Sequence, residues 1–167
     1  VLLQNYPNLE YIIMDGGSND NSVEIIKKYE PWLKYWVSEK DKGQADAIYR
    51  GFEMASGEVI AWINSDDYYL PNAFITATKY FRHNPNASLL IGSAYHVNTS
   101  GTKINKYYGM PQGFESIFIT GMHFCQPACF WQRQAFFDVG GFDRNLVFAF
   151  DYDLFLRLTK RQLPGFS

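Results

Sequence analysis

The sequence predicts an α/β domain with a mostly parallel sheet. Short apolar segments of strand length alternate with segments of helical periodicity, and Gly, Pro, Asn and Asp cluster between them. This alternation is typical of βαβ units, whose strands run parallel. Of the 167 residues, 47% are hydrophobic and 18% aromatic, which suffices for a sizeable core and excludes a disordered chain.

The first half of the chain alternates most clearly. Residues 1–4 fit the last turn of a helix that ends in a Pro-containing turn. The predicted strands are residues 9–14, 33–38, 58–63 and 88–94, and the predicted helices are residues 23–29, 43–55 and 71–83. Pro31 ends the first of these helices, and Pro85 ends the third.

The second half is richer in β-type residues and less regular. Residues 97–108 resemble a hairpin that turns at Ser100-Gly101, and residues 152–160 have a helical period. Between them lie the apolar Phe130-Trp131 and the break at Gly140-Gly141. We expect a single domain over residues 1–167, truncated at its N-terminus and also at its C-terminus.

Composition narrows the class of protein. A net charge of −2, from 15 basic and 17 acidic residues, argues against a nucleic-acid binder. No run approaches the ~18 apolar residues of a membrane span, and no signal peptide opens the sequence. Cys125 and Cys129 are too few for a disulfide framework. We expect a cytoplasmic protein and leave open peripheral association with the inner face of the membrane, through parts outside this sequence.

Carboxylates follow two of the predicted strands. Asp15 ends the first strand, and Asp66-Asp67 follow the third. Ligands of open α/β sheets bind beyond the carboxyl ends of the strands. Adjacent aspartates offer hard oxygen ligands to Mg²⁺ or Mn²⁺, which commonly use one or two carboxylates together with a substrate's phosphates. The alternative is that Asp15 caps a turn and Asp66 caps the following helix.

A third acidic group, Asp151-Tyr152-Asp153, enters the last predicted helix. It fits a general base held at a helix start, or acidic side chains favoured there by the helix dipole. Arg157 lies four residues after Asp153 and can pair with it, which would leave Asp151 free. No P-loop, GxGxxG fingerprint or zinc-ligand spacing is present.

His123, Gln126 and Trp131 form a polar and aromatic group ahead of the Gly140-Gly141 break. Aromatic faces with amide and imidazole groups suit sugar rings, so we expect these residues at an acceptor site. Core packing accounts for Trp131 equally well.

Several motifs occur in an order that resembles family 2 glycosyltransferases over nearly the whole chain. They are Asp15-Gly16-Gly17-Ser18-Asn19-Asp20, then the run from Ser38 to Ala47 with Lys42-Gly43-Gln44-Ala45-Asp46, then Ala55-Ser56-Gly57-Glu58, Asn64-Ser65-Asp66-Asp67, Gly140-Gly141-Phe142-Asp143, and Asp151-Tyr152-Asp153-Leu154. The family's first strand, with its nucleotide contact, is missing. Asn64 and Phe150 replace the acidic residues that often stand there.

The resemblance implies a GT-A fold, a Rossmann-like three-layer αβα sandwich with a mostly parallel central sheet. It implies inverting transfer of a sugar from a nucleotide-sugar donor to a glycan or lipid-linked acceptor, in polysaccharide or cell-surface glycan synthesis. Asp67 would hold Mg²⁺ or Mn²⁺, Asp66 would contact the ribose or the metal, and Asp15 and Asp46 would line the nucleotide site. Asp151 would be the catalytic base. The alternatives are a non-catalytic GT-A scaffold and a sugar nucleotidyltransferase.

Overall fold

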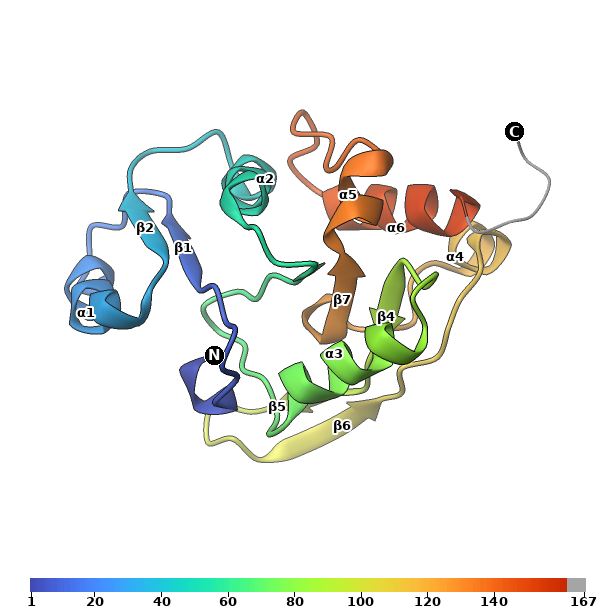
Figure 1. Cartoon of the computed structure of the whole chain (residues 1–167), viewed down its shortest axis with the longest axis horizontal. Coiled ribbons are helices and arrows are strands. Elements are labelled where there is room, and N and C mark those ends of the chain that lie inside the picture. Colours follow the sequence, from blue (N-terminus) through green and yellow to red (C-terminus); the bar gives the residue numbers. More distant parts are fainter. Residues whose placement is uncertain (162–167) are drawn as a thin grey trace.

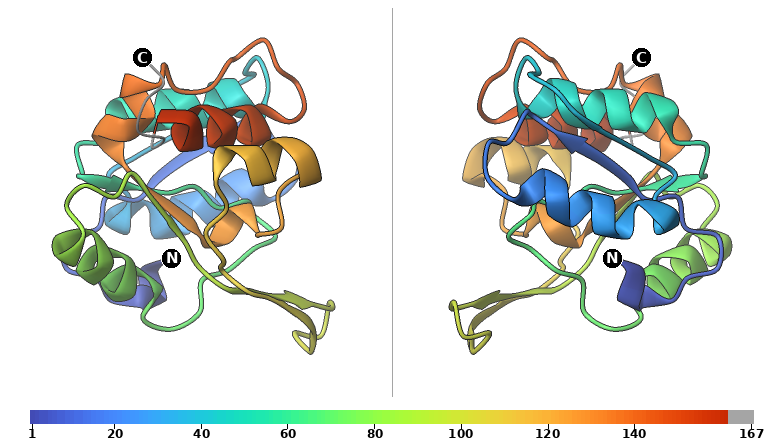
Figure 2. Two further views of the ribbon diagram at one scale, coloured as in Figure 1. Left: turned by 90° about the vertical axis from the view of Figure 1, so that its right-hand side faces the viewer. Right: turned by 90° about the vertical axis from the view of Figure 1, so that its left-hand side faces the viewer.

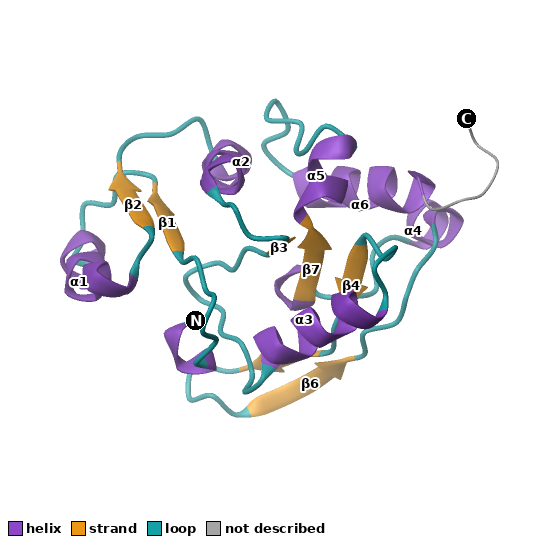
Figure 3. Ribbon diagram, in the orientation of Figure 1, coloured by secondary structure: helices purple, strands orange, loops and turns teal. Residues whose placement is uncertain are grey.

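The computed structural model of this chain describes residues 1–161. Helices cover both faces of a layer of strands (Figures 1 and 2). On one side lie α2 (Gln44–Met54), α5 (Arg133–Asp138) and α6 (Phe150–Arg161), and on the other lie α1 (Ser22–Tyr29) and α3 (Ala73–His83). The predicted three-layer α/β architecture is therefore confirmed. Figure 3 shows that long loops connect several of these elements.

The N-terminal part is a βαβ unit. Strands β1 (Ile12–Asp15) and β2 (Tyr35–Ser38) run parallel, and helix α1 (Ser22–Tyr29) connects them. A short 3₁₀ helix, Leu2–Gln4, precedes the unit. Each of these elements overlaps its predicted range, and α1 differs from it by one residue. The agreement follows because turn residues bound both strands and α1 has an amphipathic period.

The second sheet has the order β3-β7-β4. Strand β3 (Val59–Ile60) and strand β4 (Leu89–Ile91) each pair antiparallel with β7 (Cys129–Gln132) and so run in the same direction as each other. Helix α2 (Gln44–Met54) leads into β3, and α3 (Ala73–His83) leads from β3 to β4. Both hydrogen-bonded strand pairs of this sheet are therefore antiparallel, whereas β1 and β2 pair in parallel.

A two-stranded hairpin follows β4. Strands β5 (Ala94–Val97) and β6 (Lys103–Tyr107) pair antiparallel around residues 98–102, which confirms the predicted hairpin and its turn. The predicted strand 88–94 is divided at Gly92, where the chain passes so close to Ala128 that a Cβ would lie 2.9 Å from its carbonyl oxygen. In Figure 2 the hairpin projects from the body of the molecule.

After the hairpin, the described residues form three α-helices and a short 3₁₀ helix, Gln126–Ala128. Helix α6 (Phe150–Arg161) contains the helix predicted over residues 152–160. Helices α4 (Phe114–Thr120) and α5 (Arg133–Asp138) are not predicted from the sequence. Both helices are too short to show a clear helical period in the sequence. Helix α5 also follows β7 directly, with no Gly or Pro between them to indicate where the strand ends.

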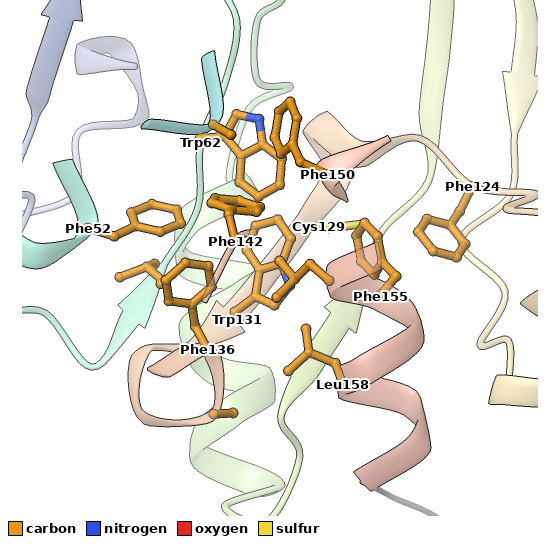
Figure 4. Packing of buried hydrophobic residues seen from close by; sticks show 14 of the residues in the cluster. Phe52, Trp62, Phe124, Cys129, Trp131, Phe136, Phe142, Phe150, Phe155 and Leu158 are labelled. Atoms are coloured by element: carbon orange, nitrogen blue, oxygen red, sulfur yellow. The ribbon is translucent and has the colours of Figure 1, made fainter. Parts of the chain in front are cut away.

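The core lies on both faces of β7. Cys129 and Trp131 point into a large, mainly aromatic cluster, whereas Phe130 packs with Ala77 and Phe81 of α3. The rings of Trp131 and Trp62 stack face to face, with centroids 4.7 Å apart and planes 9° from parallel. The large cluster further includes Phe52, Phe124, Phe136, Phe142, Phe150, Phe155 and Leu158 (Figure 4).

A groove of about 1060 Å³ separates the two sheets. All of β1 and β3 lines it, together with side chains of α2 and α3. Within residues 1–161, β1 pairs only with β2 and β3 only with β7, so each strand has one edge without a strand partner. The groove lies between the unpaired edge of β1 and that of β3. That the family's first strand is missing from this sequence stays a prediction.

None of the helices in the described part of the chain is both long and apolar enough to cross a membrane.

The Gly140-Gly141 pair supplies a test of the packing. Both residues have positive φ, +86° and +67°, but only Gly141 faces side chains: a Cβ there would collide with the Tyr49 ring and lie 3.0 Å from the Phe136 ring. Gly140→Ala should cost about 1–2 kcal/mol through backbone strain alone. Gly141→Ala should cost a further ~1–3 kcal/mol through overpacking. Denaturant unfolding measures both values, and equal losses would contradict this account of Gly141.

Candidate functional site

The Asp15 carboxylate organises the turn after β1. Oδ2 accepts hydrogen bonds from the backbone N–H groups of Gly17 and Ser18, at 3.2 and 2.9 Å, and from Ser38 Oγ at 2.5 Å. Oδ1 accepts one from Ser18 Oγ at 2.5 Å. Burial opposes the charge, but these bonds outweigh it and hold the pKa of Asp15 below its usual value. Asp15 thus caps a turn, joins β1 to β2, and also lines the groove.

Asp66 and Asp67 lie in the loop after β3. Asp67 lines the groove, and its backbone N–H donates to the carbonyl oxygen of Asn64 at 3.2 Å. Although the Asp67 side chain is exposed, its partial desolvation in the loop, and then the neighbouring charge of Asp66, raise the pKa of Asp67. Both effects disfavour the ionised carboxylate, and a bound cation would relieve them.

Asp151 occupies the first turn of α6, in a second hollow of about 220 Å³. The hollow is lined by Gln44, Trp62, Asn64, Gln126, Asp151 and residues 147–150. Arg157 donates to Asp153 Oδ2 from Nε at 2.9 Å and from Nη2 at 2.5 Å, which confirms the predicted pair. Among the described residues Asp151 has no ion pair, and its Oδ1 accepts only the backbone N–H of Tyr152 at 2.8 Å.

The two hollows meet at Gln44 and Asn64, which line both of them. Gln44 Nε2 donates to Asn64 Oδ1 at 2.7 Å, so an amide pair stands between the groove with Asp15 and Asp67 and the hollow with Asp151. No role is predicted for Gln44 from the sequence. Its place in the run Lys42-Gly43-Gln44-Ala45 is the signal that could have identified it.

The structure places Asp46 away from both hollows. It lies on α2, is 7% exposed, and accepts a hydrogen bond from Arg144 Nη1 at 3.1 Å. The Arg144 guanidinium also stacks over the Tyr49 ring, 4.9 Å from its centroid. Asp46 therefore ties α2 to the loop that precedes α6, and its predicted nucleotide contact stays a prediction.

The predicted acceptor residues do not form one group. Gln126 lines the Asp151 hollow and donates from Nε2 to the carbonyl oxygen of Trp62 at 3.1 Å. His123 is exposed, lines neither hollow and pairs through Nε2 with the carbonyl oxygen of Thr120 at 2.9 Å. The expectation that Trp131 contacts an acceptor is wrong, because the residue is fully buried in the core against Trp62.

The acidic loop is the part of the site that fits a metal ion. Within residues 1–161 no three His, Cys, Asp or Glu side chains gather in a metal-binding group. Mg²⁺ needs no such cage, because one or two carboxylates together with substrate phosphates complete its coordination. Asp67 lines the groove and Asp66 precedes it in the loop, so their carboxylates would supply such an incomplete donor set, and the metal site stays a prediction.

Comparison with known proteins gives concordant matches. The family model "Glycosyl transferase family 2" matches residues 1–141. A chondroitin synthase of Pasteurella multocida (strain Pm70) is 30% identical over 165 residues, which is 95% of this chain but 17% of that protein. The chain therefore spans about a sixth of that relative's length.

The fold also matches solved structures. The crystal structure of S. aureus TarS has a TM-score of 0.71 at 17% identity, over 94% of this chain and 29% of that one. A complex of TarS 1-349 with UDP-GlcNAc has a TM-score of 0.67 at 15% identity, over 94% and 47%. These similarities confirm the predicted GT-A fold.

The Asp46–Arg144 pair should contribute more to stability than an exposed pair does. Arg144→Gln would leave the Asp46 carboxylate buried without a cationic partner, which should cost about 1–3 kcal/mol, near the lower end because Arg144 is half exposed. Arg50→Gln, which removes the partner of half-exposed Glu39, is the matched control and should cost less than Arg144→Gln. Equal losses in denaturant unfolding would contradict this role of Asp46.

Proposed function

Because the chain belongs to the family 2 glycosyltransferases, we propose that it transfers a sugar from a nucleotide-diphosphate sugar to an acceptor hydroxyl, with inversion at the anomeric carbon. The observation that carries the proposal is the meeting of two hollows at Gln44 and Asn64. One hollow contains carboxylates suited to holding the cation that would accompany a donor's diphosphate. The other contains a carboxylate suited to activating an acceptor.

The donor would occupy the groove side of the site, near Asp15 and Asp67. TarS, which shares the fold, is described in complex with UDP-GlcNAc, so a uridine diphosphate sugar is the first donor to test. The charged side chains that line the groove are acidic, and the chain as a whole has a net charge of −2. A diphosphate would therefore meet no basic patch there. A divalent cation held by Asp67 and Asp66 would neutralise the diphosphate leaving group.

The acceptor would enter the Asp151 hollow. The Asp151 carboxylate would take the proton from the acceptor hydroxyl as its oxygen attacks the anomeric carbon from the face opposite the leaving group. Arg157 holds Asp153, and this pairing keeps the guanidinium away from Asp151. Gln126, fixed to the Trp62 carbonyl, can donate its second amide N–H to the acceptor.

The biological setting is also a proposal. The similarity to a chondroitin synthase supports a role in assembling a polysaccharide or cell-surface glycan. Such an enzyme would act in the cytoplasm or at the inner face of the membrane.

The base assignment is tested in full-length protein with a panel of UDP-, GDP-, dTDP- and CMP-sugars and Mn²⁺. Asp151→Asn should lower kcat by about 100-fold or more, the range for loss of a general base, and leave UDP affinity unchanged. Asp153→Asn is the matched control, and its kcat should fall far less. Turnover of Asp151→Asn at the parent rate would refute the assignment, and donor binding without turnover across many acceptors would favour a scaffold.

The metal assignment has its own variant. Asp67→Ala should lower kcat/KM by about 100-fold or more and abolish Mn²⁺ binding measured by calorimetry in the presence of UDP. Asp41→Asn, which removes another carboxylate that lines the groove, should still bind Mn²⁺. Turnover that persists in a chelator would contradict a metal role for Asp67.

A further inference from the structure

Charge is unevenly distributed along this chain. Residues 68–114 contain Lys79, Arg82, Lys103 and Lys106 but no Asp or Glu, so all 17 acidic residues lie elsewhere. This segment is thus basic within a protein whose net charge is −2. It includes the β5–β6 hairpin, which carries two of the four basic residues.

One face of the hairpin combines basic and aromatic side chains. The register pairs Tyr95 with Lys106 and, after a shift between His96 and Val97 that leaves Ile104 unpaired, Val97 with Lys103. This bulge brings the two lysines, three residues apart, to the same face as Tyr95. Lys103 Nζ lies 4.1 Å from the centroid of the Tyr95 ring, and Lys106 Nζ lies 4.5 Å from that of Tyr108. Within residues 1–161 neither ammonium group has a carboxylate partner in an ion pair.

The described part of the chain leaves this ribbon largely uncovered. All five residues of β6 are exposed, whereas a strand of a folded domain usually buries one face. Ile104 is 56% exposed and Tyr108 is 63% exposed. The views in Figure 2 agree that the hairpin extends away from the three layers.

The base of the hairpin is firmly anchored. The Gly109 backbone N–H donates to Ser93 Oγ at 3.0 Å. The Gly109 backbone also crosses close to residues 91–92, which lie just before β5. A Cβ at position 109 would be 2.5 Å from the carbonyl oxygen of Ile91 and would collide with Gly92. A side chain at position 109 would therefore not fit without a shift of the backbone at the base of the hairpin.

We propose that the β5–β6 hairpin binds an anionic glycan. The ammonium groups of Lys103 and Lys106 pair with acidic groups of the glycan, and the exposed ring of Tyr108 stacks on a sugar ring. The tyrosine rings hold both ammonium groups in place, which lowers the entropy lost on binding. Strand β6 reaches about 17 Å, so its side chains can contact more than one sugar unit.

The turn argues for a glycan over a lipid surface. Residues 98–102 are Asn, Thr, Ser, Gly and Thr, and Asn98 Oδ1 accepts hydrogen bonds from the backbone N–H groups of Ser100 and Thr102 at 3.1 and 2.9 Å. A hairpin that inserts into a bilayer would present apolar side chains at its tip. Here the basic and aromatic groups lie along the side of the strands.

Binding is tested with the full chain and three probes. The probes are a hyaluronan oligosaccharide, which carries carboxylates, a neutral chitin oligosaccharide of similar length, and vesicles of phosphatidylglycerol with phosphatidylcholine. Lys103→Gln/Lys106→Gln should weaken hyaluronan binding about tenfold, as expected for two exposed charge contacts, and reduce its salt dependence. Tyr108→Ala should also weaken it, and Tyr108→Phe should retain it.

The matched control is Lys79→Gln/Arg82→Gln, which removes the same charge from exposed positions on α3 and should leave binding nearly unchanged. Equal weakening by both double variants, equal affinity for the neutral glycan, absence of hyaluronan binding, or binding to vesicles alone would each overturn the proposal. Thermal melting confirms that each variant is folded. Sugar transfer is not measured here, so this result is independent of the proposed catalytic function.

Discussion

Trp62 and Trp131 stack at 4.7 Å, and this contact joins the chain that leaves β3 to the central strand β7. Trp62 lies two residues before Asn64, and its carbonyl oxygen fixes Gln126. Its ring also packs near Phe150, the residue before Asp151. The acidic loop and the start of α6 are therefore positioned by the same buried ring, which is why two hollows with different chemistry adjoin each other.

The parts of the fold that the sequence predicts are those determined locally. The period of α6, the i,i+4 pair Asp153–Arg157 and the hairpin turn depend on residues close in sequence. The sequence does not predict strand β7, because this strand is buried on both faces and so shows no alternation. The partner of Asp46 is Arg144, 98 residues later, and no local pattern indicates such a contact.

The same limit applies to the site. Asp15, Asp67 and Asp151 could be selected because acidic residues follow apolar segments at strand ends and at a helix start. Trp131 could not be assigned, since a tryptophan suits a core and a sugar site equally well and only its burial decides. Asp15 shows that the two interpretations can coexist: its carboxylate accepts four hydrogen bonds from the protein, so its contribution to a ligand would come mainly through the shape of the turn it holds.

The groove between β1 and β3 has a practical consequence for work with this chain in solution. In the described residues both strands present an edge of N–H and C=O groups without a strand partner, beside apolar side chains such as Ile12 and Ile60. An open edge of this kind is a template on which another strand can pair. Where nothing occupies the groove, the concentrated protein is exposed to edge-to-edge aggregation, and solubility would then be governed by these two strands more than by its surface charge.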